Sequence, residues 1–141
     1  MSEPRHEFMA LPLYGVCDTS GSMSGGGIDG LNRAVPAMRD VLRADALAKD
    51  IVKTSFIEFS DSARVVLPLG DLVEADVPPF RAQGGTSYTA PLELLAKTIE
   101  ADVEQLSKQG FGVYRPVVFF LSDGGPNTSG WESLVPTLPY T

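Results

Sequence analysis

A chain of 141 residues, 43% of them hydrophobic and 21% charged, has the size and composition of a single domain with one core. Its net charge of -7 at pH 7 argues against nucleic acids and anionic membranes as partners, because both select for basic patches, and it is compatible with a cation site. No apolar segment is long enough to span a bilayer, and the first residues lack the apolar stretch of a secretory signal, so we expect a cytoplasmic protein.

The first predicted element is a strand from Leu11 to Cys17. Residues 1–10 mix charged and polar side chains and are predicted to form a flexible tail, which contains His6, the one histidine of the chain. The run from Leu11 to Cys17 is apolar and is followed by turn residues, a pattern typical of a strand buried on both faces. The single cysteine, Cys17, is interpreted as a small hydrophobic core residue.

A loop rich in serine and glycine follows this strand. It begins Asp18-Thr19-Ser20-Gly21-Ser22 and offers one carboxylate and two hydroxyls. In open α/β sheets ligands bind at the carboxyl ends of strands, and hard oxygen donors suit Mg²⁺, Mn²⁺ or Ca²⁺ better than zinc or copper. From this loop alone, a metal site and a turn in which the aspartate bonds to its own backbone are equally good interpretations.

A helix and a hairpin are predicted next. Apolar residues at helical spacing indicate an amphipathic helix that ends near Lys49, and Pro36 is expected either to kink it or to move its start to about Asn32. A strand from Ile51 to Phe59 follows. The turn after it is too short for a crossover, so the short strand from Ala63 to Leu67 is predicted to be antiparallel and to lie at the sheet edge.

The second half of the chain repeats the alternation of helix and strand. After an irregular segment, residues 70–83, Gly84-Gly85-Thr86 leads into a second helix. The apolar stripe of this helix consists of Leu92, Leu95, Ile99, Val103 and Leu106. A second continuous apolar strand is predicted from Val117 to Leu121, followed by a loop with Asp123, and a third helix is expected to begin at Trp131 to Leu134.

This order of elements predicts an α/β domain with a mostly parallel sheet and one antiparallel edge strand. In a parallel sheet the carboxyl ends of the strands share an edge, so Asp18 and Asp123 converge if their strands are neighbours. Thr86, just before the second helix, belongs to the same edge by topology and adds a third hydroxyl. The predicted constellation therefore consists of Asp18, Ser20, Ser22, Thr86 and Asp123.

The constellation resembles the metal-ion-dependent adhesion site (MIDAS) of the von Willebrand factor type A (vWA) domain. The family pattern is Asp-x-Ser-x-Ser on the first loop, a threonine on the second and an aspartate on the third, and all five are present here in that order. The resemblance implies a three-layer, Rossmann-like vWA fold over residues 11–141. It also implies that Ser20, Ser22 and Thr86 bind Mg²⁺ (or Mn²⁺ or Ca²⁺) through their hydroxyls, and that Asp18 and Asp123 bind it directly or through water.

Two further stretches refine the resemblance. Gly84-Gly85-Thr86-Ser87 and Leu121-Ser122-Asp123-Gly124 look most like bacterial cytosolic vWA proteins, such as those of tellurium-resistance gene clusters. A complete vWA sheet has two more parallel strands after the one that precedes Asp123, so the domain is expected to be truncated, a minimal variant, or completed by another chain. The strand Val117 to Leu121 would then have an unpaired edge, which predicts self-association or a partner that covers it.

The resemblance implies a metal-dependent protein-interaction module and no enzyme. Mg²⁺ prefers octahedral oxygen coordination, and its open position would take a carboxylate from a partner protein. The main alternative is Mg²⁺-dependent phosphoryl transfer of the haloacid-dehalogenase type, which needs a second aspartate where Ser20 stands. The sequence does not fit a P-loop, because Gly25-Gly26-Gly27 is not followed by the required lysine. It does not fit a serine-hydrolase elbow either, because that motif needs a glycine where Met23 stands. A metal-free α/β domain with polar loops also stays open.

Overall fold

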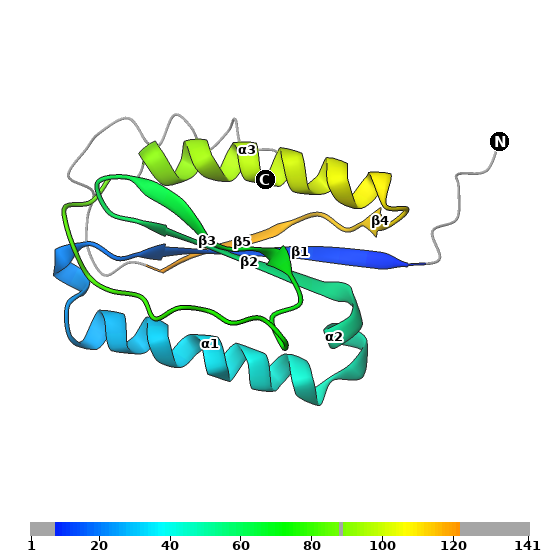
Figure 1. Cartoon of the computed structure of the whole chain (residues 1–141), viewed down its shortest axis with the longest axis horizontal. Coiled ribbons are helices and arrows are strands. Elements are labelled where there is room, and N and C mark those ends of the chain that lie inside the picture. The colour runs from blue at the N-terminus through cyan, green and yellow to red at the C-terminus, as the bar shows by residue number, and fades with distance from the viewer. Residues whose placement is uncertain (1–7, 88, 122–141) are drawn as a thin grey trace.

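The computed structural model, which describes residues 8–87 and 89–121, is built in three layers (Figure 1). A β-sheet forms the middle layer, with helices α1 and α2 on one face and α3 on the other. The elements in chain order are β1 (Met9–Asp18), a 3-10 turn (Gly21–Met23), α1 (Gly26–Ala44), α2 (Ala46–Ile51), β2 (Val52–Phe59), β3 (Ala63–Gly70), α3 (Thr89–Lys108), β4 (Gly112–Val113) and β5 (Val117–Leu121).

Strand β1 is the central strand of the sheet. It pairs in parallel with β2 on one side and with β4 and β5 on the other, and β3 lies beyond β2 as an antiparallel strand. The residues from Tyr14 to Asp18 are all buried, as expected for a strand with neighbours on both sides and helices on both faces. The predicted α/β fold, with a mostly parallel sheet and an antiparallel hairpin, is confirmed.

The sheet extends further toward the N-terminus than the sequence analysis predicted. Strand β1 begins at Met9, two residues before the predicted domain start at Leu11, because Met9 and Ala10 pair with Gly112 and Val113 of β4. Strand β4 itself was not predicted. Two residues are too few to show an alternating pattern, so no periodicity could indicate this strand.

The bounds of helix α1 differ from those predicted for the first helix. It begins at Gly26 rather than near Asn32 and continues through Pro36 to Ala44. Its buried side chains pack against the sheet: Leu31, Val35 and Leu42. Each such burial is worth about 1.5–3 kcal/mol, so the three together outweigh the cost of about 3 kcal/mol for a proline inside a helix.

The segment predicted as the end of this helix is a separate helix, α2. Asp45 interrupts the helical backbone with φ −118° and ψ 105°, and its Oδ1 accepts hydrogen bonds from the N–H groups of Leu47 and Ala48, both at 3.1 Å. An aspartate in this role is an N-cap, so it ends one helix and begins the next.

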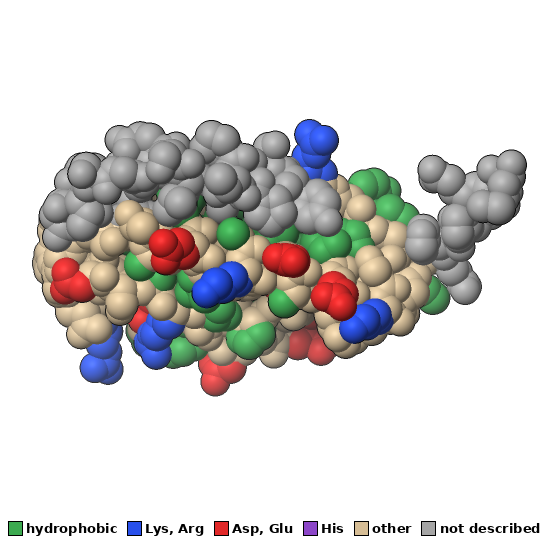
Figure 2. Space-filling model, turned by 90° about the horizontal axis from the view of Figure 1, so that it is seen from above, with side chains coloured by type: hydrophobic (Ala, Val, Ile, Leu, Met, Phe, Trp, Pro, Cys, Tyr) green, Lys and Arg blue, Asp and Glu red, His purple; other side chains and the backbone are tan. Residues whose placement is uncertain are grey.

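The two faces of the sheet carry two hydrophobic clusters. Under α3 the cluster consists of Tyr14, Val16, Ile57, Phe59, Leu92, Leu95 and Ile99. The predicted apolar stripe of the second helix is thus confirmed, with Val103 only partly buried. The outer face of α3 carries charges of both signs, Glu93, Lys97, Glu100, Glu104 and Lys108. Figure 2 shows acidic and basic side chains interspersed on this side of the molecule.

The opposite face is shaped by a glycine in the middle of β1. Gly15 pairs with Phe56 of β2 and Phe119 of β5. A Cβ atom at Gly15 would lie 2.8 Å from ring atoms of both phenylalanines, so the absence of a side chain lets the two rings fill this part of the core. The cluster on this face also contains Cys17, Met23, Leu31, Val35, Leu42, Leu72 and Phe80.

Strand β5 is less covered than its sequence predicted. Its apolar pattern indicated burial on both faces, but Val117 and Phe120 are exposed by 45% and 41%. Among the described strands, β5 has a neighbour on one side only, which accounts for this exposure. The described residues contain no helix long and apolar enough to cross a membrane. His6, Asp123 and the helix predicted from Trp131 lie outside the described residues.

Candidate functional site

The first loop of the predicted site begins at the carboxyl end of β1. The Asp18 side chain is fully buried, and one of its oxygens, Oδ1, accepts a hydrogen bond of 2.8 Å from the Ser20 N–H. The hydroxyls of Ser20 and Ser22 lie 3.1 Å apart. The bond from Asp18 to its own backbone, given above as the alternative to a metal site, is therefore present and involves one of the two carboxylate oxygens.

The second loop, residues 83–87, lies against the first. The Gly21 N–H donates to the Gly84 carbonyl at 2.8 Å, and the Gln83 N–H donates to the Thr19 carbonyl at 2.7 Å. Thr86 follows two residues after Gly84 and is 8% exposed. The loop that carries Thr86 thus shares the sheet edge with Asp18, Ser20 and Ser22, as the topology predicts.

The strand that precedes the third loop is a neighbour of β1. Leu121, the last residue of β5, pairs with Cys17, the residue before Asp18. This is the condition under which the two carboxylates were expected to converge, although Asp123 itself lies outside the described residues. Within residues 8–87 and 89–121, no three His, Cys, Asp or Glu side chains form a metal-binding group, so hydroxyls make up most of the described donor set.

A third segment at this edge was missed by the sequence analysis. The turn between β2 and β3, residues 60–62, accepts two hydrogen bonds from the second loop. The Gly85 N–H donates to Asp61 Oδ2 at 3.0 Å, and the Ser87 N–H donates to the Ser60 carbonyl at 2.7 Å. The available signal was topological, because β2 runs parallel to β1 and its carboxyl end therefore reaches the same edge.

Cys17 lies beside the site but belongs to the core. Its side chain is 1% exposed, and burial, with a smaller contribution from the nearby Glu58 carboxylate, raises the pKa of the thiol to about 12. The thiol therefore stays protonated at neutral pH and is a poor metal ligand or nucleophile. This agrees with its interpretation as a small hydrophobic residue.

Comparison with known protein families identifies the family of the domain. The family model described as the von Willebrand factor type A domain matches residues 13–126, which includes both loops and the strands that lead to them. The chain belongs to this family. Its vWA domain has the expected central strand, antiparallel hairpin and flanking helices.

Solved structures show the same fold. The vWA domain is similar to the pilus adhesin SpaC from Lactobacillus rhamnosus GG in its open conformation, with a TM-score of 0.67 and 20% identity over 86% of this chain and 16% of that chain. It is similar to the PilB minor pilin from Streptococcus sanguinis, with a TM-score of 0.59 and 16% identity over 86% of this chain and 31% of that chain.

A third similar structure is proximal thread matrix protein 1 from the mussel byssus, with a TM-score of 0.54 and 19% identity over 92% of this chain and 33% of that chain. The chain spans a third or less of each of these longer proteins. A comparison with curated protein sequences gives no significant match. The family match does not support the haloacid-dehalogenase alternative.

Proposed function

We propose that this vWA domain is a metal-dependent protein-interaction module that binds Mg²⁺ at the edge formed by its first two loops and takes a carboxylate from a partner protein. The observation that carries the proposal is the turn after β1. It combines a fully buried carboxylate, Asp18, with two hydroxyls 3.1 Å apart, those of Ser20 and Ser22. The membership of the vWA family, many of whose domains mediate protein interactions, supports the same conclusion.

The spacing of the hydroxyls fits the proposed ion. Mg²⁺ binds oxygen at about 2.0–2.1 Å in octahedral geometry, so two adjacent ligands lie roughly 3.0 Å apart. The Oγ atoms of Ser20 and Ser22 have nearly this separation. These two hydroxyls and that of Thr86 would hold the ion, with Asp18 and Asp123 as direct or water-mediated ligands. When bound, the ion would supply an electrophilic position for an oxygen ligand.

The burial of the donors fits a site that opens to a partner. A buried carboxylate is costly unless a cation or hydrogen bonds compensate its charge. Asp18 and Ser20 are buried, whereas Ser22 is exposed. The donor set therefore reaches from the core to the surface, where an ion could accept a ligand from outside. The natural ligand is a carboxylate: if the two aspartates act through water and the direct ligands are neutral hydroxyls, the ion keeps positive charge at its open position.

Calorimetric titration of the whole chain with Mg²⁺, Mn²⁺ and Ca²⁺ tests the metal site. We expect binding of Mg²⁺ or Mn²⁺, and its loss in Asp18→Ala and in Asp123→Ala. Asp71→Ala is a matched control, because Asp71 is an exposed aspartate paired with Lys53. Circular dichroism verifies that each variant is folded. Unchanged Mg²⁺ affinity in Asp18→Ala would contradict the proposal.

Binding of synthetic peptides tests the partner carboxylate. Peptides that carry a single Asp or Glu are compared with the same peptides carrying Asn or Gln, each with Mg²⁺ and with EDTA. We expect binding that needs both the carboxylate and the ion. Binding that is equal in EDTA would show that the interaction surface does not use a metal.

We expect no catalytic activity. Hydrolysis of p-nitrophenyl phosphate that depends on Mg²⁺ and disappears in Asp18→Asn would be evidence for an enzyme. The cytoplasmic location, the relation to tellurium resistance and self-association through β5 stay predictions from the sequence.

A further inference from the structure

We propose that Asp61, in the turn between β2 and β3, is a positioning residue for the metal site, because its carboxylate fixes the backbone of the loop that carries Thr86. The inference rests on the proposed function and adds a residue that belongs to none of the three metal-binding loops. Asp61 is itself exposed and is not proposed as a ligand.

The second loop is held from two sides. On one side, two hydrogen bonds join it to the first loop, from Gly21 N–H to the Gly84 carbonyl and from Gln83 N–H to the Thr19 carbonyl. On the other side, the turn at residues 60–62 accepts hydrogen bonds from two N–H groups of the loop. These are Gly85 N–H, which donates to Asp61 Oδ2 at 3.0 Å, and Ser87 N–H, which donates to the Ser60 carbonyl at 2.7 Å.

Thr86 lies between these two anchors. Gly85 before it is tied to Asp61, and Ser87 after it is tied to Ser60. The position of the Thr86 backbone beside the first loop therefore depends on the β2–β3 turn. The Thr86 side chain is nearly buried and therefore has little freedom to rotate. A shift of its backbone would shift its hydroxyl as well.

The contact with Asp61 also requires a glycine at position 84. The φ angle of Gly84 is +73°, a left-handed conformation that side chains disfavour. A Cβ atom at Gly84 would lie 2.6 Å from Asp61 Oδ2. The carboxylate therefore rests directly against the Gly84 backbone while it accepts the hydrogen bond from Gly85. The sequence Gly84-Gly85 permits this close approach.

A small displacement of Thr86 should matter for Mg²⁺. This ion demands near-ideal octahedral geometry, and residues that orient metal ligands typically change metal affinity by 10–100-fold when they are replaced. The charge of Asp61 could also attract a cation, but it is exposed, so salt and solvent screen this effect. If Asp61 acts through its hydrogen bond, Asp61→Asn should keep most of the Mg²⁺ affinity. If it acts through its charge, Asp61→Asn should lose as much affinity as Asp61→Ala.

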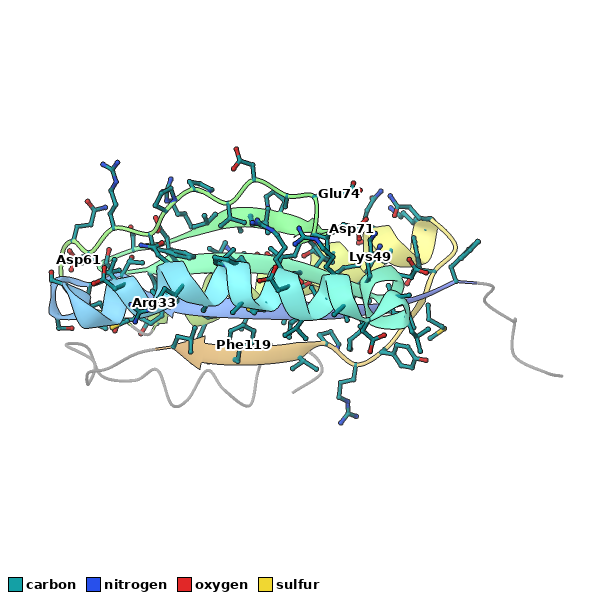
Figure 3. All side chains as sticks on the ribbon, turned by 90° about the horizontal axis from the view of Figure 1, so that it is seen from below. Arg33, Lys49, Asp61, Asp71, Glu74 and Phe119 are labelled. Carbon is teal, nitrogen blue, oxygen red and sulfur yellow. The ribbon has the colours of Figure 1, made fainter. Side chains whose placement is uncertain are left out.

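The test compares Asp61→Ala and Asp61→Asn with Asp71→Ala as the control. Asp71 is also an exposed aspartate and directly follows β3, and Figure 3 shows it well away from Asp61, which lies at one end of the molecule. We expect Mg²⁺ to bind about 10-fold more weakly to Asp61→Ala. Asp61→Asn, which keeps an oxygen acceptor, should stay close to the wild-type affinity, and Asp71→Ala should be unchanged.

Amide hydrogen exchange of the metal-free protein provides a second readout. We expect faster exchange at Gly85 in Asp61→Ala than in the wild type, with restored protection in Asp61→Asn and unchanged protection in β1 and β2. Absence of Mg²⁺ binding in the wild type would overturn the proposed function. Wild-type binding with unchanged affinity in Asp61→Ala would overturn the positioning role alone, and equal losses in both Asp61 variants would assign the effect to charge instead.

Discussion

The hydroxyl of Tyr14, in the middle of β1, donates a hydrogen bond of 2.8 Å to Asp102 Oδ2 on α3. Tyr14 is fully buried, whereas Asp102 is half-buried at the edge of the helix. The bond joins the central strand to the helix that covers it, and it satisfies a hydroxyl that would otherwise be buried among aliphatic side chains. Burial, and then the hydrogen bond and charge of Asp102, raise the pKa of Tyr14 far above its ordinary value.

Tyr14→Phe should destabilise the protein. The substitution keeps the aromatic ring and removes the hydrogen-bond donor. A hydrogen bond to a charged group contributes roughly 1.5–3 kcal/mol. Because Asp102 is half-buried and water can partly replace this bond, we expect the free energy of unfolding to fall by about 1–2 kcal/mol. Urea unfolding at pH 7 measures it. An unchanged unfolding midpoint would show that water replaces the hydroxyl without cost.

Asp102→Asn should change how stability depends on pH. Burial raises the pKa of Asp102, and the hydrogen bond from Tyr14 only partly offsets this shift. A carboxyl group whose pKa is higher in the folded state contributes stability below its unfolded value of about 3.9, and that contribution is lost as pH rises through the folded value. Asparagine does not titrate, so Asp102→Asn does not lose this stability as the pH rises. The free energy of unfolding of the variant, relative to the wild type, should therefore increase between pH 4 and pH 8, and a constant difference would contradict the prediction.

Gly15→Ala should overpack the sheet. The added Cβ would lie 2.8 Å from Phe56 and Phe119, so we expect a loss of about 1–3 kcal/mol in the free energy of unfolding. Gly30→Ala is the matched control, because a Cβ there meets nothing within 4 Å. In helix α1 alanine is favoured over glycine by about 1 kcal/mol, so this control should stabilise the protein. Chemical unfolding of both variants provides the comparison, and equal effects would disprove the packing argument.

Thr54→Val should stabilise the protein. The hydroxyl of Thr54 is buried in β2 and has no hydrogen-bond partner among the described residues, whereas the neighbouring Ser55 hydroxyl donates to the Leu67 carbonyl at 2.8 Å. Replacing an unsatisfied hydroxyl by a methyl group of similar size should raise the free energy of unfolding by about 1–2 kcal/mol. Ser55→Ala should lower it by about 1 kcal/mol. Thermal unfolding of the two variants must give shifts of opposite sign.

Much of the fold could be predicted from local patterns. The apolar runs at residues 11–17 and 117–121, the helical stripe from Leu92 to Leu106 and the short turn before Ala63 indicated their elements without tertiary information. The position of Asp18 at the end of a strand and of Thr86 just before a helix followed from the same patterns, because the carboxyl ends of parallel strands and the starts of the helices that lead back share one edge. These features depend on periodicity and chain order, which a sequence contains directly.

Other features depend on contacts between distant segments, and only the tertiary structure decided them. Helix α1 continues through Pro36 because its apolar face is buried, and β4 exists because Gly112 and Val113 meet the start of β1. The contact of Asp61 with Gly85 joins residues 24 positions apart, and that of Tyr14 with Asp102 joins residues 88 apart. No local pattern specifies such pairs, because their stability comes from packing and hydrogen bonds that form only when the whole sheet is assembled.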